Sequence, residues 1–340
     1  MIEVKNLTKV YGNHTAVDNL SFSIENGHVY GFLGPNGAGK STTMNIITGC
    51  LAATEGTVKI DGYDIYENPV EAKKCIGYLP EQPPLYMNET PVDYLMFVGE
   101  AKGLKGEELK NQVELVIEKT KLQDMRHKAI GKLSKGYKQR VGIAQAILGN
   151  PKVIILDEPT IGLDPIQIIE IRDLIKELGK EHTVIFSSHI LSEVQTICDK
   201  ILIISKGKLI AFDDADNLEN TMSQTNTITF IAETDEATAH EVLWNNEHIS
   251  DASFVSKEEG YIEGAVKTGY DDIKAVCKEI FMAFAQKQIP LVELKSKKAN
   301  IEDIFIELAG NAHRETMVEE ENEDDISLTE NTTGSEDDEL

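Results

Sequence analysis

Cysteine is scarce in this chain of 340 residues, which has only Cys50, Cys75, Cys198 and Cys277. No two of them form a Cys-x-x-Cys pair. Scattered single cysteines exclude the disulfide framework of small secreted proteins and the common zinc sites built from paired cysteines. The cysteine pattern therefore predicts a protein of a reducing compartment.

Long apolar runs are also missing. No run approaches the roughly 18 residues that a membrane-spanning helix needs. The N-terminal sequence MIEVKNLTKVYG is too polar for a secretory signal peptide. We therefore expect a soluble protein that acts at a membrane only through a partner chain.

Positive charge is in short supply, because 33 Lys and Arg face 58 Asp and Glu and the net charge is −25. A surface with this excess repels nucleic acid and anionic lipid. About half of the excess lies between Glu315 and Leu340, where twelve acidic residues occur without Lys or Arg. This composition predicts a disordered acidic tail over residues 313–340. A solvated tail that aids solubility is favoured over a specific docking element.

The glycine-rich stretch Gly34–Ser41 (GPNGAGKS) fits the P-loop pattern of a glycine, four residues and then Gly-Lys-Ser. Its glycines let successive backbone N–H groups converge on one concavity, and the following helix adds its N-terminal N–H groups and dipole. Lys40 is expected to reach the terminal phosphates, and the Ser41 hydroxyl to ligate Mg²⁺. The alternative, a flexible glycine turn before a helix, does not explain the match at every fixed position.

A pair of acidic residues follows a strand that the sequence predicts to be buried. The run Val153–Leu156 is wholly apolar, as in a strand covered on both faces of a parallel sheet. Asp157 at its end is suited to hold Mg²⁺, and Glu158 to orient or deprotonate an attacking water. An acidic strand-end turn is the alternative, but the P-loop upstream favours the nucleotide role.

Short strands and helices alternate through the first 220 residues, which we expect to form one domain. Thr90 before Pro91 is an N-cap signal, and spacings of three and four indicate the amphipathic helices. Strands are predicted over 2–4, 16–24, 28–33, 56–62, 75–79, 153–156, 183–187, 201–205 and 208–211, and helices over 42–49, 91–101, 107–120, 138–149, 166–179 and 192–198. Three prolines near Gln82 predict an irregular loop there.

Residues 221–312 show a different order, which predicts a second, accessory domain. Strands are expected over 225–233, 249–255, 261–267 and 291–295, and helices over 236–245 and 271–287. This βαββαβ order is the ferredoxin-like split pattern. Asn300–Asp303 is predicted to cap a last helix that ends near Leu308. The composition of the accessory domain indicates no metal cluster, basic patch or nucleophile. A dimer-stabilising or regulatory role is therefore favoured over ligand binding.

The first 220 residues resemble the ATP-binding cassette of ABC transporters, because further motifs follow in the order of that family. Tyr11 resembles the aromatic residue that stacks on adenine, and Gln82 the glutamine that senses Mg²⁺ and γ-phosphate. Leu133–Arg140 (LSKGYKQR) resembles the signature motif, Gly162–Asp164 the dimer-contact loop, and His189 the switch histidine. Taken alone, each of these residues has a simpler explanation, such as a surface histidine or a polar loop residue. Such explanations do not account for the occurrence of all the motifs in the order of the family.

The resemblance implies an α/β P-loop NTPase fold, with a mixed sheet core and a helical subdomain over residues 88–150. It implies Glu158 as general base, with His189 and Lys40 stabilising charge on the γ-phosphate. ATP would be bound by Tyr11, Gly34, Pro35, Asn36, Gly37, Ala38, Gly39, Lys40, Ser41, Thr42, Gln82, Ser134, Gly136 and Asp164. Mg²⁺ would be ligated by Ser41, Gln82 and Asp157.

The signature motif departs from the usual Leu-Ser-Gly-Gly-Gln of the family. Lys135 replaces the first glycine and Tyr137 the glutamine, while Ser134 and Gly136 remain for phosphate contacts. Together with a C-terminal extension, such variants resemble the exporter cassettes for antibiotics, lipids and polysaccharides.

The resemblance also implies partners. Two cassettes, identical or homologous, are expected to associate head to tail, so that each ATP is completed by the signature motif of the other copy. A separate multi-pass permease would hold the chain at the cytoplasmic face of the membrane. A soluble ABC ATPase acting on ribosomes or DNA is the alternative, which the acidic charge and single cassette disfavour. A small-molecule P-loop kinase leaves the signature and histidine motifs unexplained.

Overall fold

The computed structural model describes residues 1–214, 217–218, 226–244, 246, 248–257, 260–270 and 272–298. The chain divides into two compact units, which part between Ala215 and Asp216, and each is described by itself. The helix predicted over 300–308 and the acidic tail predicted over 313–340 lie outside the described residues.

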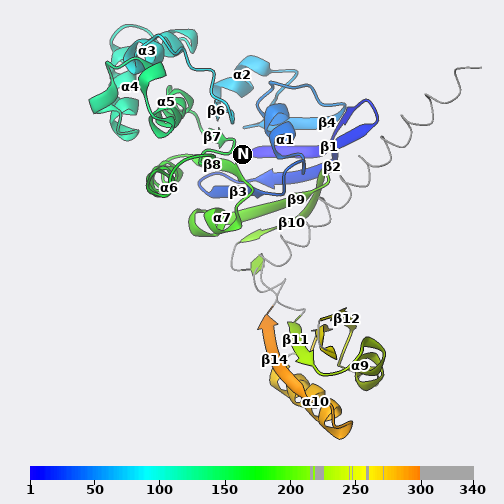
Figure 1. Ribbon diagram of the computed structural model, residues 1–340. Coiled ribbons are helices and arrows are strands. Elements are labelled where there is room, and N and C mark those ends of the chain that lie inside the picture. Colours follow the sequence, from blue (N-terminus) through cyan, green and yellow to red (C-terminus); the bar gives the residue numbers. More distant parts are fainter. Residues whose placement is uncertain are drawn as a thin grey trace, which may run out of the picture. The chain divides into compact units, whose positions relative to one another are not determined.

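A six-stranded sheet forms the centre of the first unit (Figure 1). Its order is β10-β9-β3-β8-β7-β6, with parallel pairing throughout except for the antiparallel edge strand β10. Every residue of β3, β7 and β8 is buried, as expected for central strands of a covered parallel sheet. The strands are β3 (Val29–Leu33), β6 (Ile76–Leu79), β7 (Val153–Leu156), β8 (Thr183–Ser188), β9 (Lys200–Ser205) and β10 (Lys208–Asp214). The mixed sheet predicted from the sequence is therefore present.

A second, antiparallel sheet of order β2-β1-β4-β5 packs over helix α1 (Lys40–Ile47) and the first sheet. Its strands are β1 (Ile2–Tyr11), β2 (His14–Ile24), β4 (Glu55–Ile60) and β5 (Tyr63–Asp64). Ile2, Leu20 and Val58 from this sheet share one hydrophobic core with Phe32 of β3 and Met44 of α1. Helix α1 is thereby fixed against both sheets at the end of β3.

Between the sheet strands β6 and β7 the chain forms only helices, at one side of the sheet layer in Figure 1. They are α3 (Pro91–Ala101), α4 (Gly106–Lys119), α5 (Lys135–Ile147) and the 3₁₀ turns Gln123–Met125 and Ile130–Lys132. The Thr90 hydroxyl accepts a hydrogen bond from the Asp93 N–H, which confirms the predicted N-cap. Helices α6 (Pro165–Gly179) and α7 (Leu191–Ile197) complete the unit.

Several boundaries predicted from the sequence differ from those in the structure, and one helix was missed. Helix α5 begins at Lys135 instead of residue 138, because Ser134 caps it by accepting a bond from the Tyr137 N–H. Strand β1 runs on to Tyr11 because it pairs with both β2 and β4. The short helix α2 (Pro69–Lys74) was missed, since a run of six residues is too short to show helical periodicity.

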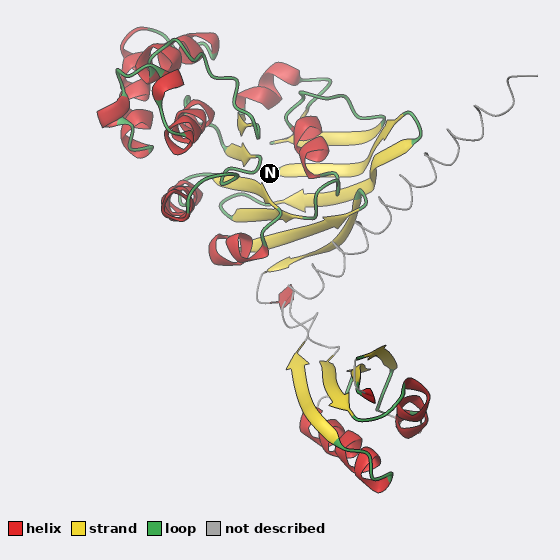
Figure 2. Cartoon of the chain, viewed as in Figure 1, coloured by secondary structure: helices red, strands yellow, loops and turns green. Residues whose placement is uncertain are grey.

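The described part of the second unit is a four-stranded antiparallel sheet with two helices (Figure 2). Its order, β12-β13-β11-β14, agrees with the βαββαβ connection predicted from the sequence. The core contains Phe230 of β11, Phe284 of α10 and Val266 of β13. The elements are β11 (Asn226–Ala232), α9 (Glu236–Leu243), β12 (Asp251–Ser256), β13 (Ile262–Thr268), α10 (Ile273–Gln286) and β14 (Leu291–Lys298).

Candidate active site

The P-loop connects β3 to α1 and has the geometry of an anion cradle. Gly37 and Gly39 have φ angles of 78° and 98°, a region that side chains disfavour. A Cβ atom at Gly39 would lie 2.4 Å from the backbone oxygen of Ala16, so only glycine fits there. Because α1 begins at Lys40, the N–H groups of its first turn have no carbonyl partner within the helix. These N–H groups are available to phosphate oxygens.

Lys40 is buried beneath this loop, with 6% of its side chain exposed. Its Nζ donates hydrogen bonds to the carbonyl oxygens of Gly34 (2.8 Å) and Pro35 (3.2 Å). Burial lowers the pKa of the ammonium, and the nearby carboxylates, Glu158 first, oppose that effect. The loop carbonyls thus hold a positive charge where a triphosphate would meet the P-loop.

Glu158 lies at the point where the P-loop, β7 and β8 converge. Its Oε1 is 3.5 Å from Nζ of Lys40, and its Oε2 is 2.9 Å from Nδ1 of His189. Only 7% of its side chain is exposed, whereas His189 is 37% exposed. The structure therefore brings together the three residues for which the sequence predicted catalysis.

The backbone at Glu158 is held in an unusual conformation. Its φ angle is 47°, which is sparsely populated by residues other than glycine. Its N–H donates to Oγ of Ser187 (2.8 Å), and the Ser187 hydroxyl donates to Oδ1 of Asp157 (2.5 Å). Ser187, which is fully buried on β8, thus fixes both acidic residues. The role of Ser187 could not be predicted from the sequence, because no local pattern shows that this side chain bonds to residues at the end of the neighbouring strand.

A pocket of about 610 Å³ follows the P-loop from Tyr11 to Glu158 and His189. Of the predicted nucleotide-binding residues, it is lined by Tyr11, Asn36, Gly37, Ala38, Gly39, Lys40, Ser41 and Thr42. Glu81 and His14 also line it, and the sequence analysis overlooked both. Glu81 directly precedes Gln82 in the predicted glutamine loop, and His14 follows Tyr11 by three residues, but the spacing of the motifs does not show which side chains face the pocket.

The other predicted site residues do not line this pocket. Gln82 is exposed, and its neighbour Glu81 faces the pocket instead. Asp164 caps α6 by accepting a bond from the Gln167 N–H (2.9 Å), and a Cβ atom at Gly136 would meet the Gln167 side chain. Ser134 and Gly136 begin α5, next to the start of α6. The roles of Gln82, Ser134, Gly136 and Asp164 stay predictions.

The donor set at the predicted metal site suits Mg²⁺, which takes oxygen ligands and binds through one or two protein groups plus substrate phosphates. The Ser41 hydroxyl lines the pocket, and the Asp157 carboxylate, buried at the end of β7, has a second oxygen beyond the one bonded to Ser187. Among the described residues there is no cluster of three His, Cys, Asp or Glu that would form a metal site by itself. The residues fit an ion that arrives with a nucleotide.

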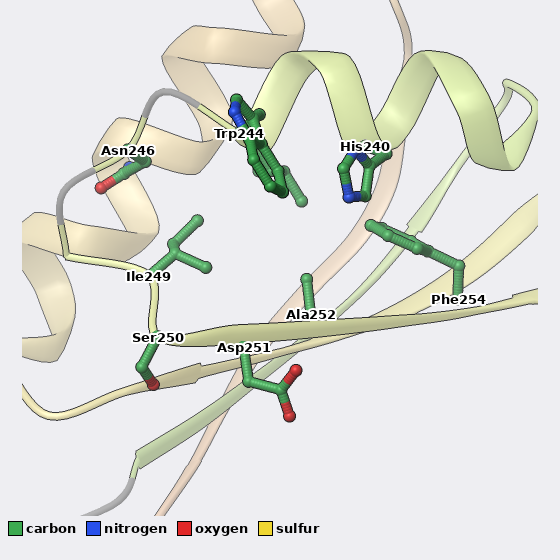
Figure 3. A pocket seen from close by; sticks show the side chains of 9 residues that line it. His240, Trp244, Asn246, Ile249, Ser250, Asp251, Ala252 and Phe254 are labelled. Atoms are coloured by element: carbon green, nitrogen blue, oxygen red, sulfur yellow. The ribbon is translucent and has the colours of Figure 1, made fainter.

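A separate hollow of about 370 Å³ lies in the second unit, between α9 and β12 (Figure 3). Trp244 and His240 project from the helix toward the strand, and their rings lie 4.8 Å apart between centroids. The Asp251 carboxylate points to the other side of the strand. Among the described residues that line this hollow there is neither a glycine-rich loop nor a lysine to bind a triphosphate.

Comparison with known proteins decides the family. The ABC transporter family model matches residues 17–161. The uncharacterized ABC transporter ATP-binding protein YhcH of Bacillus subtilis is 38% identical over 320 residues, which are 93% of this chain and 98% of YhcH. The chain belongs to the ATP-binding proteins of ABC transporters.

Two other relatives of this ABC family member bear on its activity. The bacitracin transport ATP-binding protein BcrA of Bacillus licheniformis is 42% identical over 221 residues, 64% of this chain and 71% of BcrA. The dimeric, post-hydrolysis structure of the ATP-binding cassette MJ0796 with ADP and Pi is similar, with a TM-score of 0.58. It is 28% identical and covers 63% of this chain and 98% of that one.

This chain is therefore an ABC ATPase, as the P-loop and the motifs that follow it predicted. The transporter role is supported over an ATPase acting on ribosomes or nucleic acid. In the described part of the chain no helix is long and apolar enough to span a bilayer.

Proposed function

We propose that this chain is the ATPase subunit of an exporter, in which two cassettes close around Mg-ATP and drive a separate permease. One observation supports this proposal above the others. The P-loop pocket contains Lys40, Glu158 and His189, whereas Ser134 and Gly136 do not line it. One copy thus offers a catalytic half-site and, elsewhere, a signature motif for the ATP bound by a second copy.

In this proposal Glu158 is the general base. Its carboxylate is buried and contacts Lys40 and His189, the two side chains proposed to bind the γ-phosphate. Lys40 and the N–H groups of the P-loop bind the phosphates, and His189 donates to the γ-phosphate oxygen on which charge develops. Mg²⁺, held by Ser41 and Asp157 with Gln82, would neutralise phosphate charge. Tyr11, half exposed at the end of β1, would stack on the adenine.

The permease is proposed to dock on an exposed apolar patch that follows the Gln82 loop, made of Tyr86, Met87 and Phe97. About half of each side chain is exposed, at 52%, 48% and 51%. The rings of Tyr86 and Phe97 lie 5.4 Å apart between centroids, so the patch is continuous. Apolar side chains gathered at a surface indicate a contact with another protein. Docking there places the permease next to the loop that senses nucleotide, at the cytoplasmic face of the membrane.

Export, as against import, rests on the signature variant and on the relatives. BcrA, by its name, serves bacitracin transport. The signature motif of this chain contains Lys135 and Tyr137 where the usual motif has glycine and glutamine. The ferredoxin-like region over 221–312 is proposed to be a regulatory or dimer-stabilising domain. The tail over 313–340 is proposed to be a solvated acidic segment.

Purification of the tagged full chain from detergent-solubilised membranes of its host tests the permease proposal. A multi-pass membrane protein is expected to copurify with the wild-type chain and to be lost in a Tyr86→Ser/Phe97→Ser variant. Phe281→Ser serves as the control, because Phe281 is equally exposed (52%) but lies in the second unit. Copurification of ribosomes or nucleic acid, with no membrane protein, would contradict the proposal.

A further inference from the structure

We propose that Glu193 is a positioning residue for ATP hydrolysis, which ties the chain after Glu158 to the loop that presents His189. Glu193 lies in helix α7, outside the motifs that the sequence analysis identified. It does not line the nucleotide pocket, so any effect on catalysis acts through other residues. The inference rests on the proposed roles of Glu158 and His189.

The Glu193 carboxylate is almost completely buried, with 1% of the side chain exposed. Burying a charge is costly unless it is paired and hydrogen-bonded. The hydroxyl of Thr160 donates to Oε2 at 2.7 Å, and that of Ser188 donates to the same oxygen at 3.1 Å. Nη2 of Arg172 lies 3.4 Å from Oε1. The carboxylate is thus satisfied by three different elements.

The two hydroxyls belong to the segments that carry the catalytic groups. Thr160 is two residues beyond Glu158, and Ser188 directly precedes His189. A single carboxylate oxygen therefore fixes the distance between the turn after β7 and the end of β8. Ser187 makes the corresponding link on the other side, through Asp157 and the Glu158 N–H. The 2.9 Å contact between His189 and Glu158 joins the same two segments that the Ser187 and Glu193 hydrogen bonds hold together.

Arg172, the third partner of Glu193, connects the segments after β7 and β8 to the predicted dimer-contact loop. Arg172 lies on α6, the helix that Asp164 caps at its N-terminus. A shift of α6 on closure of two cassettes would move Arg172 and, through Glu193, the Ser188–His189 segment. Glu193 thereby couples the dimer-contact loop to the geometry of the base and the switch histidine.

Catalytic geometry is sensitive to such links, because a displacement of about 1 Å can lower the rate about hundredfold. In Glu193→Gln, the amide nitrogen cannot accept a hydrogen bond, so either the two hydroxyls or the arginine lose their partner. For the full-length chain we expect kcat to fall about tenfold to hundredfold, with the KM for ATP changed less than twofold. Thr160→Val keeps the side-chain shape and removes one link, so a smaller loss in kcat is expected.

A double variant, Glu193→Gln/Thr160→Val, separates positioning from mere support of the fold. If Glu193 acts through Thr160, the double variant is about as slow as Glu193→Gln alone. The control is Glu177→Gln, which removes an exposed ion pair with Lys180 on α6. Thermal unfolding and binding of a fluorescent ATP analogue are measured for each variant. Thr160→Val is expected to bind the analogue as wild type does and to unfold at a somewhat lower temperature, because it removes one buried hydrogen bond.

Wild-type kcat in a folded Glu193→Gln variant overturns the inference. So does a loss of kcat that merely follows a lowered unfolding temperature and weaker ATP binding. If Glu193→Gln does not fold, the kcat of Thr160→Val tests the inference instead. An unchanged kcat in that variant overturns it. Glu158→Gln distinguishes the two proposals. Turnover retained there removes Glu158 as base, whereas turnover lost there and kept in Glu193→Gln removes only the positioning role.

Discussion

Nδ1 of His189 lies 2.9 Å from Oε2 of Glu158, although the two residues are 31 positions apart in the sequence. They meet because β7 and β8 are parallel neighbours, so the loops after both strands leave the same edge of the sheet. His189 is more exposed than Glu158, and both side chains line the P-loop pocket. A nucleotide in this pocket would therefore meet the histidine and the carboxylate together.

Replacement of His189 is expected to affect turnover far more than nucleotide binding. His189→Ala removes a donor directed at the charge that develops on the γ-phosphate, so kcat should fall about hundredfold or more. Affinity for a fluorescent ATP analogue should change by no more than a few-fold. His127→Ala, at an exposed position far from the P-loop in sequence, is the control. An equal loss of binding and turnover in His189→Ala would contradict the assigned role.

Replacement of Lys40, in contrast, is expected to weaken nucleotide binding itself. Lys40→Ala removes the buried charge that contacts the loop carbonyls and Glu158. A hydrogen bond to a charged group is worth about 1.5–3 kcal/mol, so ATP affinity should fall about tenfold to hundredfold. Lys180→Ala, at a side chain 67% exposed, should leave affinity unchanged. Titration with the fluorescent analogue measures both, and wild-type affinity in Lys40→Ala would refute the phosphate contact.

The second unit can be tested through one glycine. A Cβ atom at Gly264 on β13 would lie 2.3 Å from Cζ of Phe230, a fully buried ring. Gly264→Ala should therefore destabilise this unit by about 1–3 kcal/mol, the usual cost of overpacking. Gly269→Ala is the matched control, because a Cβ there meets nothing within 4 Å. Chemical denaturation followed by Trp244 fluorescence reports this unit alone, and equal midpoints for both variants would contradict the packing.

The cysteines should differ in reactivity. Cys198 is buried behind β3, and burial raises the pKa of its thiol well above the usual value. Less of the reactive thiolate is then present at any given pH. Cys50 is exposed and should react with a maleimide within minutes, whereas Cys198 should react only after denaturation. Mass spectrometry after digestion identifies the labelled cysteine, and rapid labelling of native Cys198 would show that the core is wrongly assigned.

Most of the site could be predicted because its residues are tied to local patterns. The P-loop needs glycines at Gly37 and Gly39 for backbone reasons, and the buried strand before Asp157 is a wholly apolar run. Such local requirements restrict which residue types can occur at these positions, so the sequence alone predicts them.

Other features depend on contacts between distant segments, which no local pattern shows. Ser187, Thr160 and Glu193 act only because β7 and β8 end side by side. The extension of β1 to Tyr11 results from pairing on both of its edges. The loop near Gln82 was expected to be irregular, but which of its side chains faces the pocket follows from the loop's path alone.

The central claim is that each ATP is held between two copies of the chain. Analytical ultracentrifugation of Glu158→Gln with Mg-ATP tests it most directly, because this variant is expected to bind ATP without hydrolysing it. The account predicts a shift from a 37.7 kDa monomer to a species of twice that mass. Addition of Ser134→Arg to the same variant should leave a monomer that still binds ATP. A Glu158→Gln protein that stays monomeric in Mg-ATP, or whose dimer is indifferent to Ser134→Arg, would contradict the account.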